Sequence, residues 1–405
     1  MSRQRASSHR LSSSHHAQTM GVMAFAGLFV VGCGDDDTVD PGNDPRCAPA
    51  APECLVRHEG CKFTDDAARC EACPPGERPM LPNGQCVAFG STPQTHSFGP
   101  FTVAAGGEDR GVCESWVLGN TNDVFVNAVE VASDGGFHHS VLFYLPETFQ
   151  DWPTDRWVDC YENGFDEVTA ALAGGVLLAT STEVDGEMQQ FPAGVAMRIP
   201  PNSRIIAAMH LKNDGAQAVT TSLRTKLYTI PAADVTSRLA PSQMVIPGLE
   251  IPTDAPSTFT ATCDLATAYS DLYDRPLSLK VRGFLPHIHP ATTAFQVRVV
   301  GGPNDGRLLV DLGPYEPSTL GWVLDPPVDL AGATGLSLRC SYDHTMAADA
   351  SWGNGHEEKC ETLIHVESDM AFAGVIGPGA EPPTPAPDGT RTWGCQALAF
   401  TYDAE

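Results

Sequence analysis

From His96 onward the sequence is made of short apolar segments separated by glycine, proline, asparagine and aspartate. Residues 123–131 largely alternate between apolar and polar side chains, and residues 205–209 are a continuous apolar run of strand length. Repeated short strands with turn residues between them are typical of antiparallel β-sandwiches. Roughly 300 residues are more than one sandwich needs. The pattern therefore predicts an all-β protein with an N-terminal sandwich over residues 96–232 and a C-terminal one over residues 233–405.

The thirteen cysteines are a second constraint, and six of them fall within residues 47–86. That segment has few large apolar residues, so it cannot build a sufficient core, and it is typical of a small module held by disulfides. Cys70 and Cys73 have the spacing of a redox or zinc pair, but four other cysteines surround them and no histidine pair follows. We expect a disulfide-rich module and linker over residues 47–95. Its pairing stays open, because six cysteines allow 15 pairings.

The first 32 residues have the layout of a secretory signal peptide. Residues 1–19 contain arginine and serine but no acidic residue, and the apolar run at residues 20–31 is too short to cross a bilayer. The run ends in Val-Val-Gly-Cys at Cys33, which resembles the lipobox of bacterial lipoproteins. The resemblance implies lipidation of Cys33. The residues that follow are rich in Asp, Gly, Pro and Asn, which indicates a flexible linker over residues 33–46. We expect an exported protein attached to a bacterial membrane, at the outer membrane or the periplasmic face, through lipid alone.

Charge excludes one class of partner. The chain has 24 basic and 50 acidic residues and a formal net charge of −26. Binding to nucleic acid needs a basic face that neutralises phosphates, so we do not expect it here. No Ser-His-Asp order, phosphate-binding glycine loop or paired-carboxylate signature stands out, so motifs assign no catalytic residue.

Histidine occurs in two patterns suited to metal binding. His138 and His139 are adjacent and follow a glycine pair at 135–136, which allows the irregular backbone that neighbouring side chains need to share one ion. His287 and His289 are two residues apart, so both imidazoles lie on one face of a strand. The prolines on either side of this second pair indicate an exposed segment outside a central ladder.

Together with His210, these patterns resemble the copper type II, ascorbate-dependent monooxygenases, the family of peptidylglycine α-hydroxylating monooxygenase and dopamine β-monooxygenase. The resemblance covers roughly residues 96–400. It implies two tandem jelly-roll-like antiparallel β-sandwiches, each with one copper ion facing a solvent-filled cleft. It also implies three disulfides in the sandwiches: Cys113–Cys160, Cys263–Cys395 and Cys340–Cys360.

The resemblance also assigns roles to the histidines. His138, His139 and His210 would hold the copper that stores and passes one electron, and His287 and His289 would hold the copper that binds dioxygen. Imidazole suits both oxidation states of copper. The implied reaction hydroxylates a C–H bond of a small or medium-sized organic substrate with O2 and an external one-electron reductant such as ascorbate.

The sequence departs from the family at the second copper. The family's third ligand there is a methionine directly before the cysteine that matches Cys360, and this position is Lys359. An ammonium group has no lone pair for a metal. We expect His356 to replace the methionine, with Met346 as the other candidate. If the second site is altered or inactive, the chain is instead a copper-binding relative that acts as a binding or interaction protein. A third hypothesis is an extracellular adhesion protein in which the histidines bind no metal.

The substrate-binding positions differ as well. Where peptide-amidating members hold a carboxylate, this chain has Leu285, Glu361 and Leu363, and Arg282 lies in the same strand but out of register. A peptidylglycine substrate is therefore not supported. We expect a solvated charge pair at residues 357–358. The remaining histidines are interpreted as structural or surface residues: His58, His96, His344 and His365.

Overall fold

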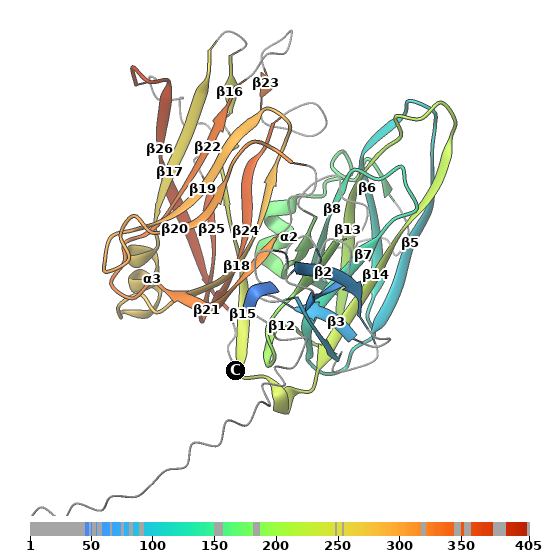
Figure 1. Ribbon diagram of the computed structural model, residues 1–405, viewed down its shortest axis with the longest axis horizontal. Helices are drawn as coiled ribbons and strands as arrows, with labels where there is room; N and C mark the ends of the chain where they lie inside the picture. The colour runs from blue at the N-terminus through green and yellow to red at the C-terminus, as the bar shows by residue number, and fades with distance from the viewer. Residues whose placement is uncertain are drawn as a thin grey trace, which may run out of the picture. The chain divides into compact units, whose positions relative to one another are not determined.

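The computed structural model describes residues 45–47, 50, 54, 59–64, 67–73, 77–80, 84–88, 93–149, 157–180, 187–247, 249–252, 255–316, 321–343, 350–351, 358–375 and 386–402. Strands dominate these residues and the helices are short, which confirms the predicted all-β class: two β-sandwiches preceded by a small disulfide-rich module (Figure 1). Residues 1–32, which were expected to form a signal peptide, and Cys33 lie outside the described residues. Within them, no helix is both long and apolar enough to span a bilayer.

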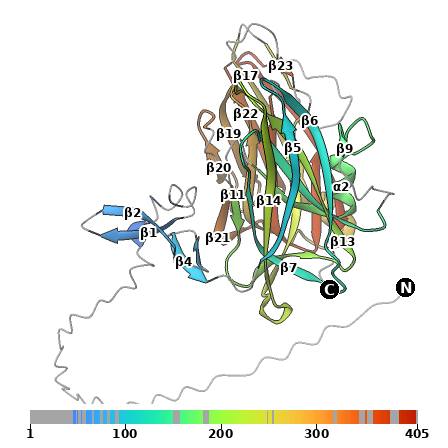
Figure 2. The ribbon, with the colours of Figure 1, turned by 90° about the vertical axis from the view of Figure 1, so that its right-hand side faces the viewer.

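The first sandwich packs two sheets around one core. One sheet has the order β10 (Gly175–Ala179), β8 (His139–Pro146), β13 (Ser203–Lys212), β6 (Glu108–Val117) and β9 (Trp157–Val158). The other has β12 (Val195–Ile199), β7 (Val124–Ala132), β14 (Val219–Ile230) and β5 (Gln94–Val103), with β11 (Glu187–Gln190) paired to β7. Figure 2 shows β5 and β14 side by side, as their ladder requires.

Strand β13 explains the continuous apolar run at residues 205–209. It lies between β6 and β8, and nine of its ten residues are buried. A strand covered on both faces needs apolar side chains at successive positions rather than at alternate ones. The short helix α2 (Glu167–Ala173) lies between β9 and β10 in the chain, with its first turn capped by the side chain of Asp166.

The second sandwich has the same two-layer plan. One sheet has the order β20 (Leu308–Leu312), β19 (Thr292–Val300), β22 (Gly335–Tyr342), β17 (Ser257–Asp264) and β26 (Thr390–Thr401). The other has β21 (Trp322–Asp329), β18 (Lys280–Ile288), β24 (Cys360–Glu367), β15 (Ser237–Val245) and β25 (Met370–Val375). Burial alternates along β17, which places Phe259, Ala261 and Cys263 in the core. Helix α3 (Leu265–Tyr273) follows β17, and a short pair joins β16 (Glu250–Ile251) to β23 (Ala350–Ser351).

Strand β15 belongs to both sandwiches. Residues 237–239 pair in parallel with β12, and residues 240–245 pair with β24. The core of the first sandwich also takes in Leu285 and Leu363 from β18 and β24. Backbone pairing and side-chain packing therefore both connect the two sandwiches.

Six disulfides are present among the described residues. The module of β1 (Glu59–Thr64), β2 (Ala67–Ala72), β3 (Glu77–Met80) and β4 (Gln85–Ala88) has the pairs Cys47–Cys61, Cys54–Cys70 and Cys73–Cys86, where the sequence left the pairing open. The sandwiches contain the three pairs that the resemblance implies: Cys113–Cys160, Cys263–Cys395 and Cys340–Cys360.

The expectation for Pro286 is confirmed in its pairing. Its strand, β18, lies between β21 and β24, but the ladder to β21 ends at Phe284. Pro286 therefore occupies a stretch of β18 that has one neighbouring strand, outside a central ladder, which proline tolerates. The expected exposure was wrong, because His287 and His289 are buried at 5% and 4% relative exposure.

Candidate metal centre

The first histidine pair lies where a loop becomes a strand. His138 is the last residue of the loop, after two glycines with positive φ of 89° and 63°, and His139 is the first residue of β8. The backbone N–H of His138 donates to the carbonyl of His210 over 2.9 Å. His139 and His210 are direct cross-strand partners in the β8–β13 ladder. Because His138 precedes the regular strand, all three imidazoles can converge without a bulge between His138 and His139.

The three rings form a compact group. The ring centroid of His210 lies 4.5 Å from that of His138 and 4.9 Å from that of His139. One nitrogen from each residue lies within 4.8 Å of the others. We call His138, His139 and His210 the first triad.

The second histidine pair lies at the end of β18. Nε2 of His287 is 3.2 Å from Nε2 of His289, as expected for side chains on one face of a strand. Nδ1 of His287 lies 3.2 Å from the carbonyl oxygen of Thr180, which follows β10 of the first sandwich. When the Nδ1–H of His287 donates a hydrogen bond to that carbonyl, the lone pair of the ring is on Nε2, which faces His289.

The two pairs meet across the sandwiches. The rings of His139 and His287 are 4.7 Å apart, and His139 forms a second group of potential ligands with His287 and His289. We call these three residues the second triad. The resemblance implies two separate ions facing a solvent-filled cleft, whereas the five histidines form one buried cluster with His139 in both triads.

Glu108 orients one ligand of the first triad. Its Oε1 lies 2.8 Å from Nε2 of His210, from the neighbouring strand β6. In the described residues, Nδ1 of His210 is buried and has no hydrogen-bond partner. A carboxylate on one ring nitrogen and an open lone pair on the other is the arrangement typical of a metal-bound histidine. The donor set of the first triad therefore fits a metal ion.

The sequence did not indicate Glu108. The residue is 102 positions from His210 and stands in no motif with it. Thr180, whose carbonyl faces His287, was missed for the same reason. Only the strand pairing brings these groups to the histidines.

Burial keeps His139, His210 and His287 uncharged at neutral pH. It lowers the pKa of His210 to about 4, with the charge of His138 as the next cause. It lowers the pKa of His287 to about 3, with the charge of Lys359 as the next cause. Burial and then His287 hold the pKa of His139 well below its ordinary value. Neutral imidazoles have the free lone pair that metal binding requires.

Lys359 lies beside the second triad. Its side chain is 5% exposed, and its Nζ lies 3.9 Å from Oε1 of Glu361. The pairing of β18 with β24 aligns His287 with Glu361 and Ile288 with Cys360, which places Lys359 next to the histidine pair. His356 and Met346, the two residues expected to replace the missing methionine, lie outside the described residues.

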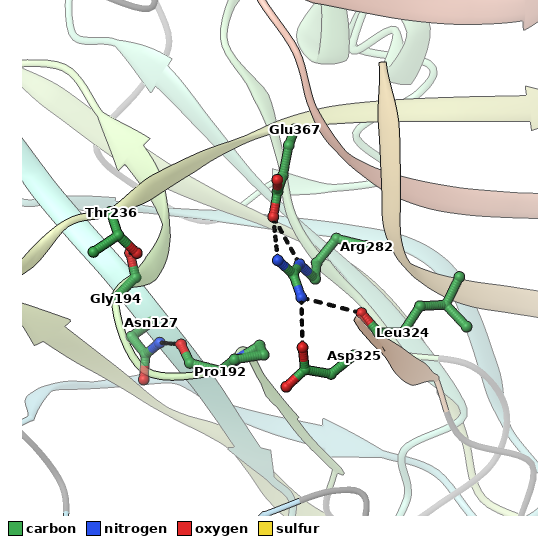
Figure 3. Close-up of polar contacts among 8 residues, drawn as sticks. All are labelled: Asn127, Pro192, Gly194, Thr236, Arg282, Leu324, Asp325 and Glu367. Atoms are coloured by element: carbon green, nitrogen blue, oxygen red, sulfur yellow. Dashed lines mark hydrogen bonds and ion pairs between the residues drawn. The ribbon is translucent and has the colours of Figure 1, made fainter. Parts of the chain in front are cut away.

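A cavity of about 420 Å³ adjoins the second triad, with His287 and Lys359 in its wall. Leu285, Glu361 and Leu363 also line it, at the positions where peptide-amidating members hold a carboxylate. Arg282 does not face this cavity. Figure 3 shows its guanidinium bound to the carboxylates of Glu367 and Asp325 and to the carbonyl of Leu324.

The expected solvated charge pair was wrong for Glu358, and Glu357 lies outside the described residues. Glu358 is 2% exposed, and its Oε1 accepts the N–H of Ala291 over 3.0 Å. Burial raises its pKa to about 7. Ala291 lies in the turn that follows His289, so this carboxyl group holds the turn in place.

The remaining histidines are outside the cluster. His96 stacks on Trp116, and His365 is buried against Phe191. His58 and His344 lie outside the described residues.

No protein-family model matches the sequence, and no curated protein matches it. Solved structures show weak likeness. The major capsid protein P2 of bacteriophage PM2 has a TM-score of 0.32 at 12% identity, over 68% of this chain and 97% of that one. PNGF-II has a TM-score of 0.28 at 10% identity, over 68% and 65%. VP2 from the subviral particle of infectious bursal disease virus has a TM-score of 0.18 at 10% identity, over 69% and 73%. None is similar enough to assign a function.

Proposed function

We propose that this chain is a copper-dependent monooxygenase that hydroxylates a C–H bond of an organic substrate with O2 and an external reductant such as ascorbate. The observation that carries the proposal is the convergence of five buried histidines from three parts of the chain, at the positions that the sequence resemblance selects. Five buried imidazoles offer ligands that suit copper in both oxidation states.

The residues around the histidines support the same reading. Bound copper would supply one-electron transfer and activation of dioxygen. Glu108 fixes the ring of His210, and the carbonyl of Thr180 fixes the ring of His287. The adjoining cavity offers a place where a substrate can lie beside His287.

A second candidate function follows from Lys359. Its ammonium group lies beside His287, where the resembling family has a thioether. A positive charge at this point disfavours a bound cation, and the missing sulfur removes a ligand that favours Cu(I). The alternative is therefore a copper-binding protein with one working site.

Copper content separates the two candidates. We expect the purified chain to bind two copper ions, measured by mass spectrometry after equilibrium dialysis, and the double variant His287→Ala/His289→Ala to bind one. His96→Ala, a histidine outside the cluster, is the matched control and should keep both. One ion that the double variant retains would favour the alternative, and a chain without copper would contradict both candidates.

We also propose that the chain is exported and held at a bacterial membrane by lipid on Cys33. Six disulfides support an oxidising compartment. Intact-mass analysis of the membrane-extracted protein should show cleavage before Cys33 and added acyl chains, and Cys33→Ala should remove both. An uncleaved or unacylated chain would contradict this part of the proposal.

A further inference from the structure

The cavity beside the second triad has walls from both sandwiches. Val141, Phe143 and Val176 come from β8 and β10 of the first, and Leu285 and Leu363 come from β18 and β24 of the second. Its volume of about 420 Å³ lies in the lower part of the range for pockets that enclose small organic ligands. A ligand inside it would replace water against largely apolar side chains, which favours hydrocarbon surface.

The polar groups of the cavity already face one another. Nζ of Lys359 lies 3.9 Å from Oε1 of Glu361, and the hydroxyl of Tyr161 donates to Oε1 of Glu167 over 2.7 Å. The charges of Lys359 and Glu361 both act on Glu167, so the four groups form one cluster across the sandwiches. All four line the cavity.

This cluster leaves little for a charged ligand to gain. A carboxylate could approach Lys359 only beside Glu361 and Glu167, which would repel it. An ammonium ion could approach those carboxylates only beside Lys359. Burying a charge without a dedicated partner is costly, whereas a hydroxyl or carbonyl group can hydrogen-bond at the cluster without adding charge.

We propose that the cavity binds an uncharged, largely hydrocarbon molecule with at most one hydrogen-bonding group, directed at the cluster of Lys359, Glu361, Tyr161 and Glu167. Its hydrocarbon part then lies beside His287. That this molecule is the substrate rests on the proposed function. Binding itself requires no copper.

The test uses three probes with one carbon skeleton: phenylbutanol, phenylbutanoate and phenylbutylammonium. Each is titrated calorimetrically at neutral pH into the purified chain after copper is removed with a chelator. We expect phenylbutanol to bind about tenfold or more tightly than either charged probe, because only the charged probes lose the hydration of an ion. Equal or tighter binding of a charged probe, or no binding of phenylbutanol, overturns the proposal without any variant.

A pair of variants locates the binding. Ala179→Phe places a ring in the cavity and should abolish phenylbutanol binding. Ala173→Phe makes the same change in a smaller cavity of about 210 Å³ near Tyr144 and should leave binding unchanged. Phenylbutanol binding that survives Ala179→Phe also overturns the proposal. Copper content is measured on each preparation before the chelator is added. A chain that binds no copper but still binds phenylbutanol would therefore contradict the proposed function and leave the cavity proposal standing.

Discussion

The contact between Glu108 and His210 gives the sharpest prediction. Oε1 of Glu108 lies 2.8 Å from Nε2 of His210, and the carboxylate also accepts from Arg110 over 3.2 Å. Burial raises the pKa of Glu108, but the hydrogen bonds from Arg110 and His210 outweigh it and leave the pKa below its ordinary value. The group is therefore a carboxylate at neutral pH, and it raises the basicity of the imidazole that it contacts.

The size of the effect follows from this geometry. Losing such a partner lowers metal affinity by about 10- to 100-fold, or about 1.4 to 2.8 kcal/mol. Glu108→Gln keeps an acceptor oxygen, and the side chain is 24% exposed, so part of its charge is screened. We expect a loss of about tenfold for Glu108→Gln and a loss closer to 100-fold for Glu108→Ala.

The assay is competition for Cu(I) with the chelator bicinchoninate, in the His287→Ala/His289→Ala background so that only the first triad is measured. Glu130→Gln is the matched control, because Glu130 accepts from Lys226 and Tyr228 rather than from a cluster histidine. If Glu108→Gln binds Cu(I) as tightly as the parent while its circular dichroism is unchanged, the assigned role of Glu108 is wrong.

Two further predictions concern single side chains. Lys359→Met removes the ammonium beside His287 and adds a thioether. Because it removes a positive charge that opposes a bound cation and adds a ligand that favours Cu(I), it should raise Cu(I) affinity at the second triad by about tenfold or more. The control Lys280→Met, an exposed lysine at the other end of β18, should not. Burial lowers the pKa of His365 to about 3. Between about pH 6.5 and pH 3 this histidine is therefore protonated in the unfolded chain but neutral in the folded chain. The free energy of unfolding decreases as the pH falls through this range. His365→Gln should remove about 2 to 3 kcal/mol of the stability difference between pH 6.5 and pH 4.5 in urea titrations, and an unchanged difference would contradict the assignment.

The sequence predicted the fold class because its evidence is local. A strand-length apolar run depends on burial along one strand, and β13 shows this pattern. The alternating segment at residues 123–131 also forms a strand, β7, although Phe125 to Val129 are all buried. The candidate ligands were also found locally, as two short histidine patterns plus His210.

What escaped prediction depends on packing between distant segments. The shared position of His139 follows from the way β8 and β18 meet, which no spacing in the sequence encodes. Glu358 is charged by type, yet the fold buries it where an N–H of the turn after His289 needs an acceptor. The prolines correctly indicated a stretch of β18 with one neighbouring strand, but not its exposure, because packing against the first sandwich buries that stretch.

The β12–β15 ladder has a consequence for the distance between the triads. Only three residue pairs make it up, Val195–Ser237 to Met197–Leu239. A register slip of two residues would move one sandwich along the other by about 7 Å. That exceeds the 4.7 Å between the rings of His139 and His287. The distance between the rings of His139 and His287 is therefore a property of backbone register. Mutations in β12 or β15 can change it without replacing a histidine.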